Sequence, residues 1–341
     1  MTTTDLANVL GSVHLSGGDS LPGWRDTLPA PMISRSEISI WSVLKKCIGK
    51  DLTRISVPVV FNEPLSFLQR LAEYMEYAEL LEEANKCTDP IERFENVVAF
   101  IVSSLSCNYM RLSKPFNPLW FETYELDRTE ESGYRFIAEQ VSHHPPKSAF
   151  HAESKSYEFD GVVSPRLKLW GSSVEVQPSG NFQLKLLNHG EIYTWKTLNV
   201  TVHNIVMGQI YIQMKNIPLI QGSRLLWKSR PRPANSSVMY NFTLFTFLLN
   251  DPSGITDLLP PTDSRRRPDI RLLEEGQTEA AEKEKERLEV KQRQARTLMK
   301  KAQEKLPKWF KRMDEISKDE LSWVFTHKYW DREYCDCENI Y

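Results

Sequence analysis

The chain has 341 residues, of which 40% are hydrophobic and 11% aromatic, and its formal net charge is -2. This composition is typical of an ordinary globular protein with ample core, and it argues against a nucleic-acid-binding class, which would be strongly basic. The five cysteines lack the spacing of a disulfide framework or a zinc site. They predict reduced thiols and a cytoplasmic location.

The N-terminal part of the chain predicts a leader followed by an amphipathic helix. Residues 1–23 are rich in Thr, Ser and Gly and favour a flexible leader. Ser36 can cap a helix that Gly49 can end. One apolar face recurs there at three- and four-residue steps: Ile38, Trp41, Leu44 and Ile48. Such a stripe is usually the core face of a helix.

Two further helices and a run of strands are predicted next. One helix should begin near Asn62, with Pro64 in its first turn, and continue to Ala78. Another should follow the Asp89-Pro90 pair. From Tyr134 onward, short runs rich in β-branched and aromatic residues alternate with Gly, Asn and Ser, which predicts an antiparallel β-meander.

Residues 113–118 read Ser-Lys-Pro-Phe-Asn-Pro and place a cation directly before the first of two prolines. Pro115 and Pro118 restrict the loop, so Lys114 emerges from a preorganised backbone. A lysine in a loop is more commonly a solubilising charge with no specific partner.

Residues 139–148 read Glu-Gln-Val-Ser-His-His-Pro-Pro-Lys-Ser. The diproline holds His144 in extended geometry, so His143 and His144 can direct hydrogen-bond donors at one anion such as a phosphate. A hydrolase is disfavoured because Ser142 adjoins its histidine and no Gly-x-Ser-x-Gly turn accompanies it. A metal site is disfavoured because adjacent histidines diverge. The remaining alternative is a solvated surface loop.

The last informative region is a charged helix predicted over about 278–305, which residues 265–271 precede with four arginines. Lys285, Glu289 and Arg293 lie four residues apart and share one side of this helix. Alternating charges at helical spacing usually form only a solvated face.

The 113–118 loop, the 139–148 string and the Lys-x3-Glu-x3-Arg spacing together resemble the signatures of the oxysterol-binding protein family, over about residues 25–341. The resemblance implies an α+β fold: an incomplete antiparallel β-barrel around a lipid tunnel, with an N-terminal amphipathic lid, a helical layer and a C-terminal helical subdomain. The expected lipid-binding domain spans 24–341. Its parts would be a lid at about 36–58, helices at 62–110, the barrel at 111–250 and the subdomain at 251–341.

The resemblance also implies roles for individual residues. The phosphoinositide headgroup would contact Lys114, Asn117, His143, His144, Lys285, Glu289 and Arg293. The lid and sterol end would involve Trp41, Leu44, Ile48 and Asn108. An asparagine at position 108 could equally cap a helix end. No catalytic residue, metal or cofactor is expected.

The function implied is lipid transfer without covalent chemistry. A lipid exposes several hundred Å² of apolar surface in water, so leaving a membrane costs on the order of 10 kcal/mol, and a closed tunnel removes most of that cost. Relatives carry sterol and phosphatidylinositol 4-phosphate alternately in one tunnel and exchange them between membranes, although some prefer phosphatidylserine. The expected partners are these lipids and transient membrane surfaces, from a cytoplasmic, membrane-peripheral location. No nucleic-acid partner is expected, and no protein partner is indicated.

The sequence departs from the family pattern at two places. After residues 201–213 the chain passes almost directly to 220–227, where relatives insert several more strands. Missing strands would leave a gap in the barrel wall. Relatives also have Gly at the position of Phe121, so the headgroup mouth could be narrower here. The alternative function is therefore a regulatory or scaffold protein that recognises phosphoinositide headgroups without efficient lipid extraction.

Overall fold

The computed structural model describes residues 25–33, 57–111, 113–170, 173–197, 200–203, 211–214, 225–299, 306–313 and 321–341. The predicted leader and most of the predicted lid, including Trp41, Leu44 and Ile48, lie outside these residues. Among the described helices, none is long and apolar enough to cross a membrane.

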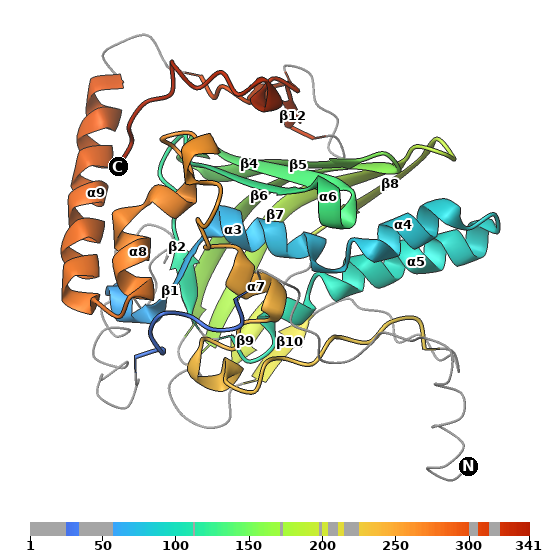
Figure 1. Ribbon diagram of the computed structural model, residues 1–341, viewed down its shortest axis with the longest axis horizontal. Helices are drawn as coiled ribbons and strands as arrows, with labels where there is room; N and C mark the ends of the chain where they lie inside the picture. Colours follow the sequence, from blue (N-terminus) through green and yellow to red (C-terminus); the bar gives the residue numbers. More distant parts are fainter. Residues whose placement is uncertain are drawn as a thin grey trace.

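One antiparallel sheet forms the centre of the molecule (Figure 1). Its strands are β3 (Thr123–Arg128), β4 (Tyr134–His143), β5 (Pro146–Ser154), β6 (Tyr157–Trp170), β7 (Ser173–Leu186), β8 (Glu191–Lys196), β9 (Val200–His203) and β10 (Tyr211–Met214). The order is β10-β9-β7-β6-β5-β4-β3, and β8 also pairs with β7. Within the described strands, β3 and β10 are not joined. The sheet is therefore open, as the predicted incomplete barrel requires.

The predicted helix from Asn62 is wrong in its first turn. Asn62 and Pro64 belong to strand β1 (Asn62–Ser66), which pairs in parallel with β2 (Lys114–Phe116). Ser66 then caps α3 (Phe67–Ala72) in a capping box with Gln69, so the helix begins one turn later than predicted. This pairing with a strand about 50 residues away overrides the local helix signal.

The rest of this region is helical, as predicted, but broken into short pieces. They are the 3-10 turns η3 (Val59–Phe61), η4 (Glu73–Tyr77) and η5 (Ser106–Asn108), and the helices α4 (Glu79–Lys86) and α5 (Pro90–Ser103). Asp89 caps α5 through the amides of Ile91 and Glu92, as the Asp-Pro pair indicated.

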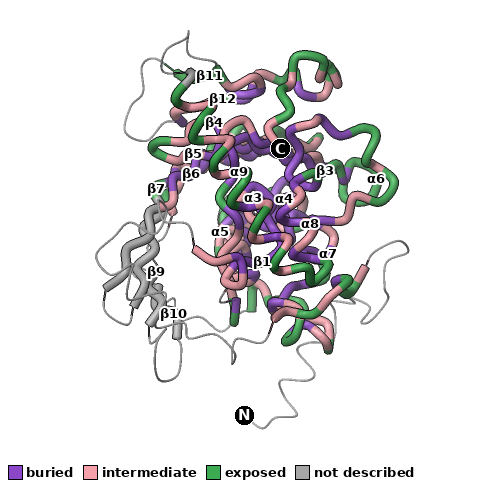
Figure 2. The backbone as a smooth tube through the Cα atoms, turned by 90° about the vertical axis from the view of Figure 1, so that its left-hand side faces the viewer, coloured by how far each residue is buried: buried purple, intermediate pink, exposed green. Residues whose placement is uncertain are grey.

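Aromatic side chains fill the contact between these helices and the sheet, where buried residues concentrate (Figure 2). The Phe150 ring centroid lies 5.1 Å from that of Phe159, and Trp195 stacks on Phe159 at 5.5 Å. Tyr74 of η4 meets Phe182 edge to face at 5.4 Å. Gly161 permits this packing, because a Cβ there would lie 2.3 Å from the Phe150 ring. The helices therefore buttress this part of the sheet.

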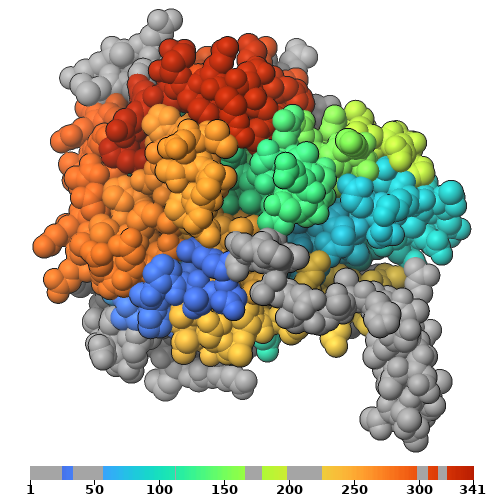
Figure 3. Space-filling model, in the orientation of Figure 1, coloured from blue at the N-terminus to red at the C-terminus, as the bar shows by residue number. Residues whose placement is uncertain are grey.

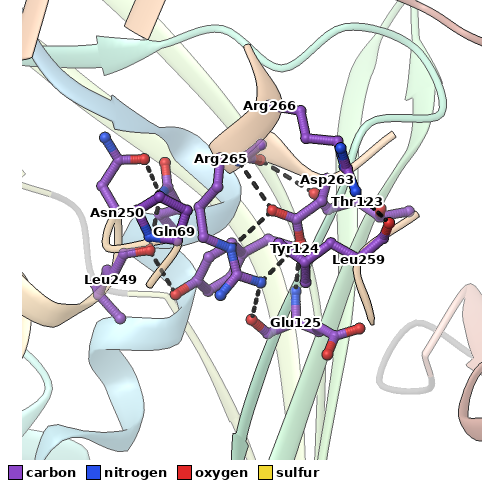
Figure 4. Close-up of polar contacts among 12 residues, drawn as sticks. Gln69, Thr123, Tyr124, Glu125, Leu249, Asn250, Leu259, Asp263, Arg265 and Arg266 are labelled. Carbon is purple, nitrogen blue, oxygen red and sulfur yellow. Dashed lines mark hydrogen bonds and ion pairs between the residues drawn. The ribbon is translucent and has the colours of Figure 1, made fainter. Parts of the chain in front are cut away.

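Residues 225–250, predicted as the end of the barrel, hold no strand. They form the turn η6 (Ser236–Val238) and the short helix α7 (Leu244–Leu248), which Thr243 caps through the amide of Thr246. The carbonyl of Leu249 accepts hydrogen bonds from Tyr124 Oη at 2.8 Å and Gln69 Nε2 at 2.9 Å, which fastens this segment to β3 and α3 (Figure 4).

The C-terminal part begins with helices and ends in a small sheet. Its elements are η7 (Thr256–Leu258), η8 (Ser264–Arg266), α8 (Pro268–Glu274), α9 (Thr278–Met299), β11 (Phe310–Arg312), β12 (Trp323–Phe325) and η9 (Tyr329–Asp331). Gly276, at φ +77°, ends α8, and the Gln277 amide donates back to the Leu272 carbonyl at 2.8 Å. The predicted charged helix is thus confirmed up to the last described residue of α9.

Two segments close over the outside of this core. Residues 25–33 lie against the regions of α7 and α8 (Figure 3), where Arg25 Nη2 pairs with Glu274 at 2.5 Å and Nε donates to the Phe247 carbonyl at 2.6 Å. Residues 306–313 and 321–341 cover β4 and β5, with Trp309 and Phe325 packed in one apolar cluster with Ile137. A short helix, α6 (Thr129–Ser132), links β3 to β4.

The aromatic packing predicts the effect of a single added methyl group. Gly161→Ala places a Cβ inside the contact distance of Phe150 and Phe182, so we expect it to lower the free energy of unfolding by about 1–3 kcal/mol. Urea titration followed by tryptophan fluorescence measures the change. Gly133→Asn is the control, because that site has φ +75° with no atom within 4 Å and tolerates Asn. Equal stability of the two variants would contradict this account of the core.

Candidate anion-binding site

Helix α9 contacts the chain segment that leads into the β1–β2 pair. Lys285 Nζ donates to the Val57 carbonyl at 2.6 Å, and the Val59 amide donates to Glu282 Oε2 at 2.5 Å. Asn62 Nδ2 of β1 in turn donates to the Lys114 carbonyl at 3.1 Å. The predicted cation loop is therefore joined through β1 to the residues that α9 holds (Figure 1).

The same helix contacts the His-His-Pro-Pro turn between β4 and β5. Gln292 Nε2 lies 3.0 Å from His143 Nδ1, and the ring centroids of His143 and His144 are 4.6 Å apart. Lys285 and Gln292 are seven residues apart, which is two helical turns, so both lie on one face of α9. That face therefore meets two of the segments that the sequence singled out.

The electrostatics of His143 follow from this position. Burial, with the neighbouring His144 and Arg296, lowers the pKa of His143 to about 4, so its imidazole is neutral at pH 7. The Gln292 amide donates to Nδ1, which leaves the proton on Nε2. His143 thus keeps one N–H donor, while His144 beside it is exposed.

The predicted site residues differ in how deeply they are buried. Lys285 is buried and pairs with Glu289 at 3.4 Å, whereas Arg293 on the same helix is exposed. Lys114 is half-buried and Asn117 exposed. Sequence reasoning missed Gln292, because an uncharged side chain in a highly charged helix gives no signal.

Asn108, the predicted sterol contact, has polar partners of its own. Its Oδ1 accepts from Arg70 Nη2 at 2.5 Å, and its Nδ2 donates to the Leu105 carbonyl at 3.4 Å. Arg70 also pairs with Glu63 at 3.2 Å. These bonds fit the alternative in which Asn108 closes a helix end, and its contact with a sterol stays a prediction.

Two arginines of the 265–271 run are buried supports and do not reach solvent. Arg267 donates to Glu122 at 2.8 Å, to both oxygens of Asp269 at 2.7 and 3.0 Å, and to the Asn117 carbonyl at 2.9 Å. Arg265 forms a two-bond pair with Asp263 at 2.8 and 2.9 Å (Figure 4). The Arg267 contacts fix the loop that carries Asn117.

Glu139, the first residue of the 139–148 string, anchors the C-terminal segment. Its carboxylate accepts the backbone N–H groups of Lys308 at 3.1 Å and Trp309 at 3.0 Å. Burial raises the pKa of Glu139 to about 7, even though these N–H donors favour the charged form. Glu139 therefore has a structural role, which the resemblance of residues 139–148 to a binding signature did not indicate.

Phe121 has a backbone conformation that favours glycine. Its φ is +69°, in the left-handed region, and its amide donates to the Gln140 carbonyl at 3.2 Å, so the strained turn lies beside β4. The Phe121 ring stacks on Trp120 with centroids 4.8 Å apart. The aromatic pair offsets part of the cost of the backbone conformation.

These features define an α+β domain: an open antiparallel sheet, buttressed by helices, with imidazole and ammonium groups near one helix. The chain matches the family model described as oxysterol-binding protein over residues 39–222 and 218–334. It belongs to the oxysterol-binding protein family, as the sequence motifs indicated.

Relatives of known name support this assignment. The chain is 38% identical to oxysterol-binding protein-related protein 2 of Mus musculus over 93% of its own length and 88% of the relative's. It is 37% identical to oxysterol-binding protein-related protein 1 of Homo sapiens, with 95% of this chain covered. The chain spans only 45% of that second relative.

Solved structures show the same fold. The Osh3 ORD of Saccharomyces cerevisiae, in complex with PI(4)P, has a TM-score of 0.80 at 33% identity, over 93% of this chain and 99% of that one. The Osh1 ORD domain in complex with cholesterol has a TM-score of 0.85 at 31% identity, over 93% and 94%.

The comparisons also bear on the predicted missing strands. The match to human related protein 1 runs over 430 positions, more than the 341 residues of this chain, so that relative carries residues within the matched span that have no counterpart here. The family-model match is itself divided at residues 218–222, where the sequence departs from the pattern.

The burial of His143 predicts its titration. We expect the free protein to show a His143 midpoint near pH 4 in a histidine NMR titration, because the charged imidazole is disfavoured by burial and by the positive charge of Arg296. A bound phosphate ester should raise that midpoint. Arg296→Gln, which removes one of the two neighbouring cations, should raise it slightly; a midpoint near 6.5 in the parent would contradict the geometry.

Glu139 predicts a component of the pH dependence of stability. Its folded pKa, about 7, is above the ordinary 4.5, so the folded state holds the proton more tightly and stability from this group falls as pH rises from 4.5 to 7. Glu139→Gln should remove this component, on the order of 3 kcal/mol, from the difference between urea unfolding at pH 5 and pH 7.5. An unchanged difference would contradict the buried anchor.

Proposed function

We propose that this protein is a cytoplasmic, membrane-peripheral lipid-transfer protein. It binds sterol and phosphatidylinositol 4-phosphate alternately in one tunnel and exchanges them between membranes. The observation that carries the proposal is that one face of α9 contacts both the segment leading into β1–β2 and His143. The complexes of Osh3 with PI(4)P and of Osh1 with cholesterol and ergosterol support both lipids.

The headgroup site would combine donors of different kinds. Lys114 and Lys285 would supply compact positive charges. Arg293, which is exposed on α9, could form two hydrogen bonds to a phosphate through its planar guanidinium. Neutral His143 and exposed His144 add N–H donors. The other two contacts would be Asn117, as a polar donor to the headgroup, and Glu289, which already orients Lys285.

The transfer step needs no covalent chemistry. The lipid tails would lie in a tunnel of the open sheet, closed by the lid at about 36–58. Enclosing them keeps several hundred Å² of apolar surface out of water, and this offsets most of the roughly 10 kcal/mol that desorption costs. Exclusion of one lipid by the other would couple the two directions of transport.

A second function is favoured by one observation. The division of the family match at 218–222, together with residues of the relatives that this chain lacks, indicates a shortened barrel wall. A wall with a gap would admit water to the lipid tails, which is costly. The protein would then recognise phosphoinositide headgroups as a regulatory or scaffold protein without efficient extraction.

Lipid extraction from liposomes tests the proposal. Liposomes carrying labelled sterol and phosphatidylinositol 4-phosphate are incubated with the protein, and lipid is counted in the soluble fraction. We expect near-stoichiometric uptake of either lipid. His143→Ala/His144→Ala should reduce phosphoinositide uptake at least tenfold and leave sterol uptake intact.

Two controls give the result its meaning. Lys114→Ala should lower phosphoinositide uptake, whereas Lys86→Ala, at an exposed lysine that pairs with its helix neighbour Glu83 at 2.9 Å, should not. If the folded protein extracts neither lipid yet still binds headgroup-bearing liposomes, transfer is excluded and the scaffold function takes its place.

A further inference from the structure

A second cluster of ionisable side chains lies where β5 meets the C-terminal segment. His151 and Glu153 are two residues apart on β5 and therefore share one face of the sheet. His327 follows β12 and reaches the same place. Its backbone adopts a left-handed φ of +61°, a conformation that costs free energy in a residue other than glycine.

Three potential ligand atoms converge in this cluster. His151 Nε2 lies 3.2 Å from Glu153 Oε2, and His327 Nδ1 lies 3.7 Å from the same oxygen. All three atoms are within 4.8 Å of one another. A tetrahedral zinc ion with bonds of about 2.0–2.2 Å holds its ligand atoms about 3.4 Å apart. The two separations from the Glu153 oxygen lie near that value, and the two histidines, which are within 4.8 Å of each other, would move closer together on binding.

The groups behind these atoms have the arrangement of an outer coordination shell. His151 Nδ1 is 2.7 Å from Asp160 Oδ1 on β6, which places a proton on Nδ1 and directs Nε2 toward the cluster. Arg135 Nε donates to the other oxygen of Glu153 at 2.6 Å and leaves Oε2 facing the histidines. Phe325 stacks on the His151 ring at 4.7 Å and holds its plane.

We propose that His151, Glu153 and His327 bind a zinc ion, with the fourth position open to water. Two imidazoles and one carboxylate are a ligand set that zinc accepts readily. The ion would connect β5 to the loop after β12 and so fasten the C-terminal segment over the sheet. No sequence pattern indicates this site, because the third ligand is 174 residues from the second.

The charged groups around the cluster affect its affinity for zinc. Asp160 places a negative charge behind His151, 2.7 Å from its Nδ1, and Arg135 places a positive charge behind Glu153. The guanidinium of Arg135 remains close, so we expect weaker binding than at a closed site of four protein ligands.

A zinc titration of the full chain tests the proposal by calorimetry and thermal melting. The exposed Cys335 and half-buried Cys337 are replaced by Ser throughout, because thiols also bind zinc. We expect one ion per chain and a rise in melting temperature with zinc concentration. His327→Ala should lose at least tenfold in affinity and the zinc-dependent rise. Its melting temperature without zinc should stay unchanged, since the His327 side chain is 62% exposed.

Control variants decide between this site and others. His189→Ala, whose ring contacts the Asn85 carbonyl at 3.0 Å elsewhere, and His143→Ala/His144→Ala should bind zinc as the parent does. The proposal is overturned if the parent binds no zinc, or if His327→Ala binds it as tightly as the parent. Neither result depends on lipid extraction, so the proposed function is tested separately.

Discussion

The buried pair of Glu122 and Arg267 is the interaction on which the site depends. A buried carboxylate and guanidinium must be fully satisfied, because either charge left alone would cost several kcal/mol. Glu122 accepts from Ser66 and Ser264 Oγ, the Leu119 amide and Arg267, and Arg267 gives its other N–H groups to Asp269 and the Asn117 carbonyl. One cluster therefore places the start of α3, the loop after β2 and the start of α8. Through α8, and the turn at Gly276, it also sets the position of α9.

The open sheet is stabilised from two sides, which frees its rim for function. Aromatic packing around Phe150 and Phe182 holds the helical layer on one part, and Glu139 together with the His151 cluster holds the C-terminal segment on β4 and β5. Lys114 is half-buried, and His144 and Arg293 are exposed, so the proposed headgroup contacts lie nearer the surface than the aromatic core does. A protein that carries a lipid with a charged headgroup requires a well-packed apolar core and polar groups near its surface.

The sequence predicted much of the fold because its signals were local. The Asp89-Pro90 start of α5, the alternating strands after Tyr134 and the charge pattern of α9 each depend on a few adjacent residues. The strand at Asn62–Ser66 was missed because its partner, Lys114–Phe116, is distant in sequence. For the same reason Gln292 beside His143, the buried roles of Arg265 and Arg267, and the convergence of His327 on Glu153 gave no signal. The three family motifs supplied the candidate site, but only the fold shows that α9 contacts both the His-His-Pro-Pro turn and the segment that leads into β1.

If segments far apart in the sequence form one headgroup site, a bound headgroup should protect them together, and amide hydrogen exchange measures that protection. Exchange would be compared with and without a water-soluble, short-chain phosphatidylinositol 4-phosphate, read by mass spectrometry of peptides. We expect slower exchange in three places together, at 113–119, at 141–147 and over residues 285–293 of α9, with the α4–α5 hairpin unchanged. Protection confined to one of these segments, or absent from all three, would contradict it.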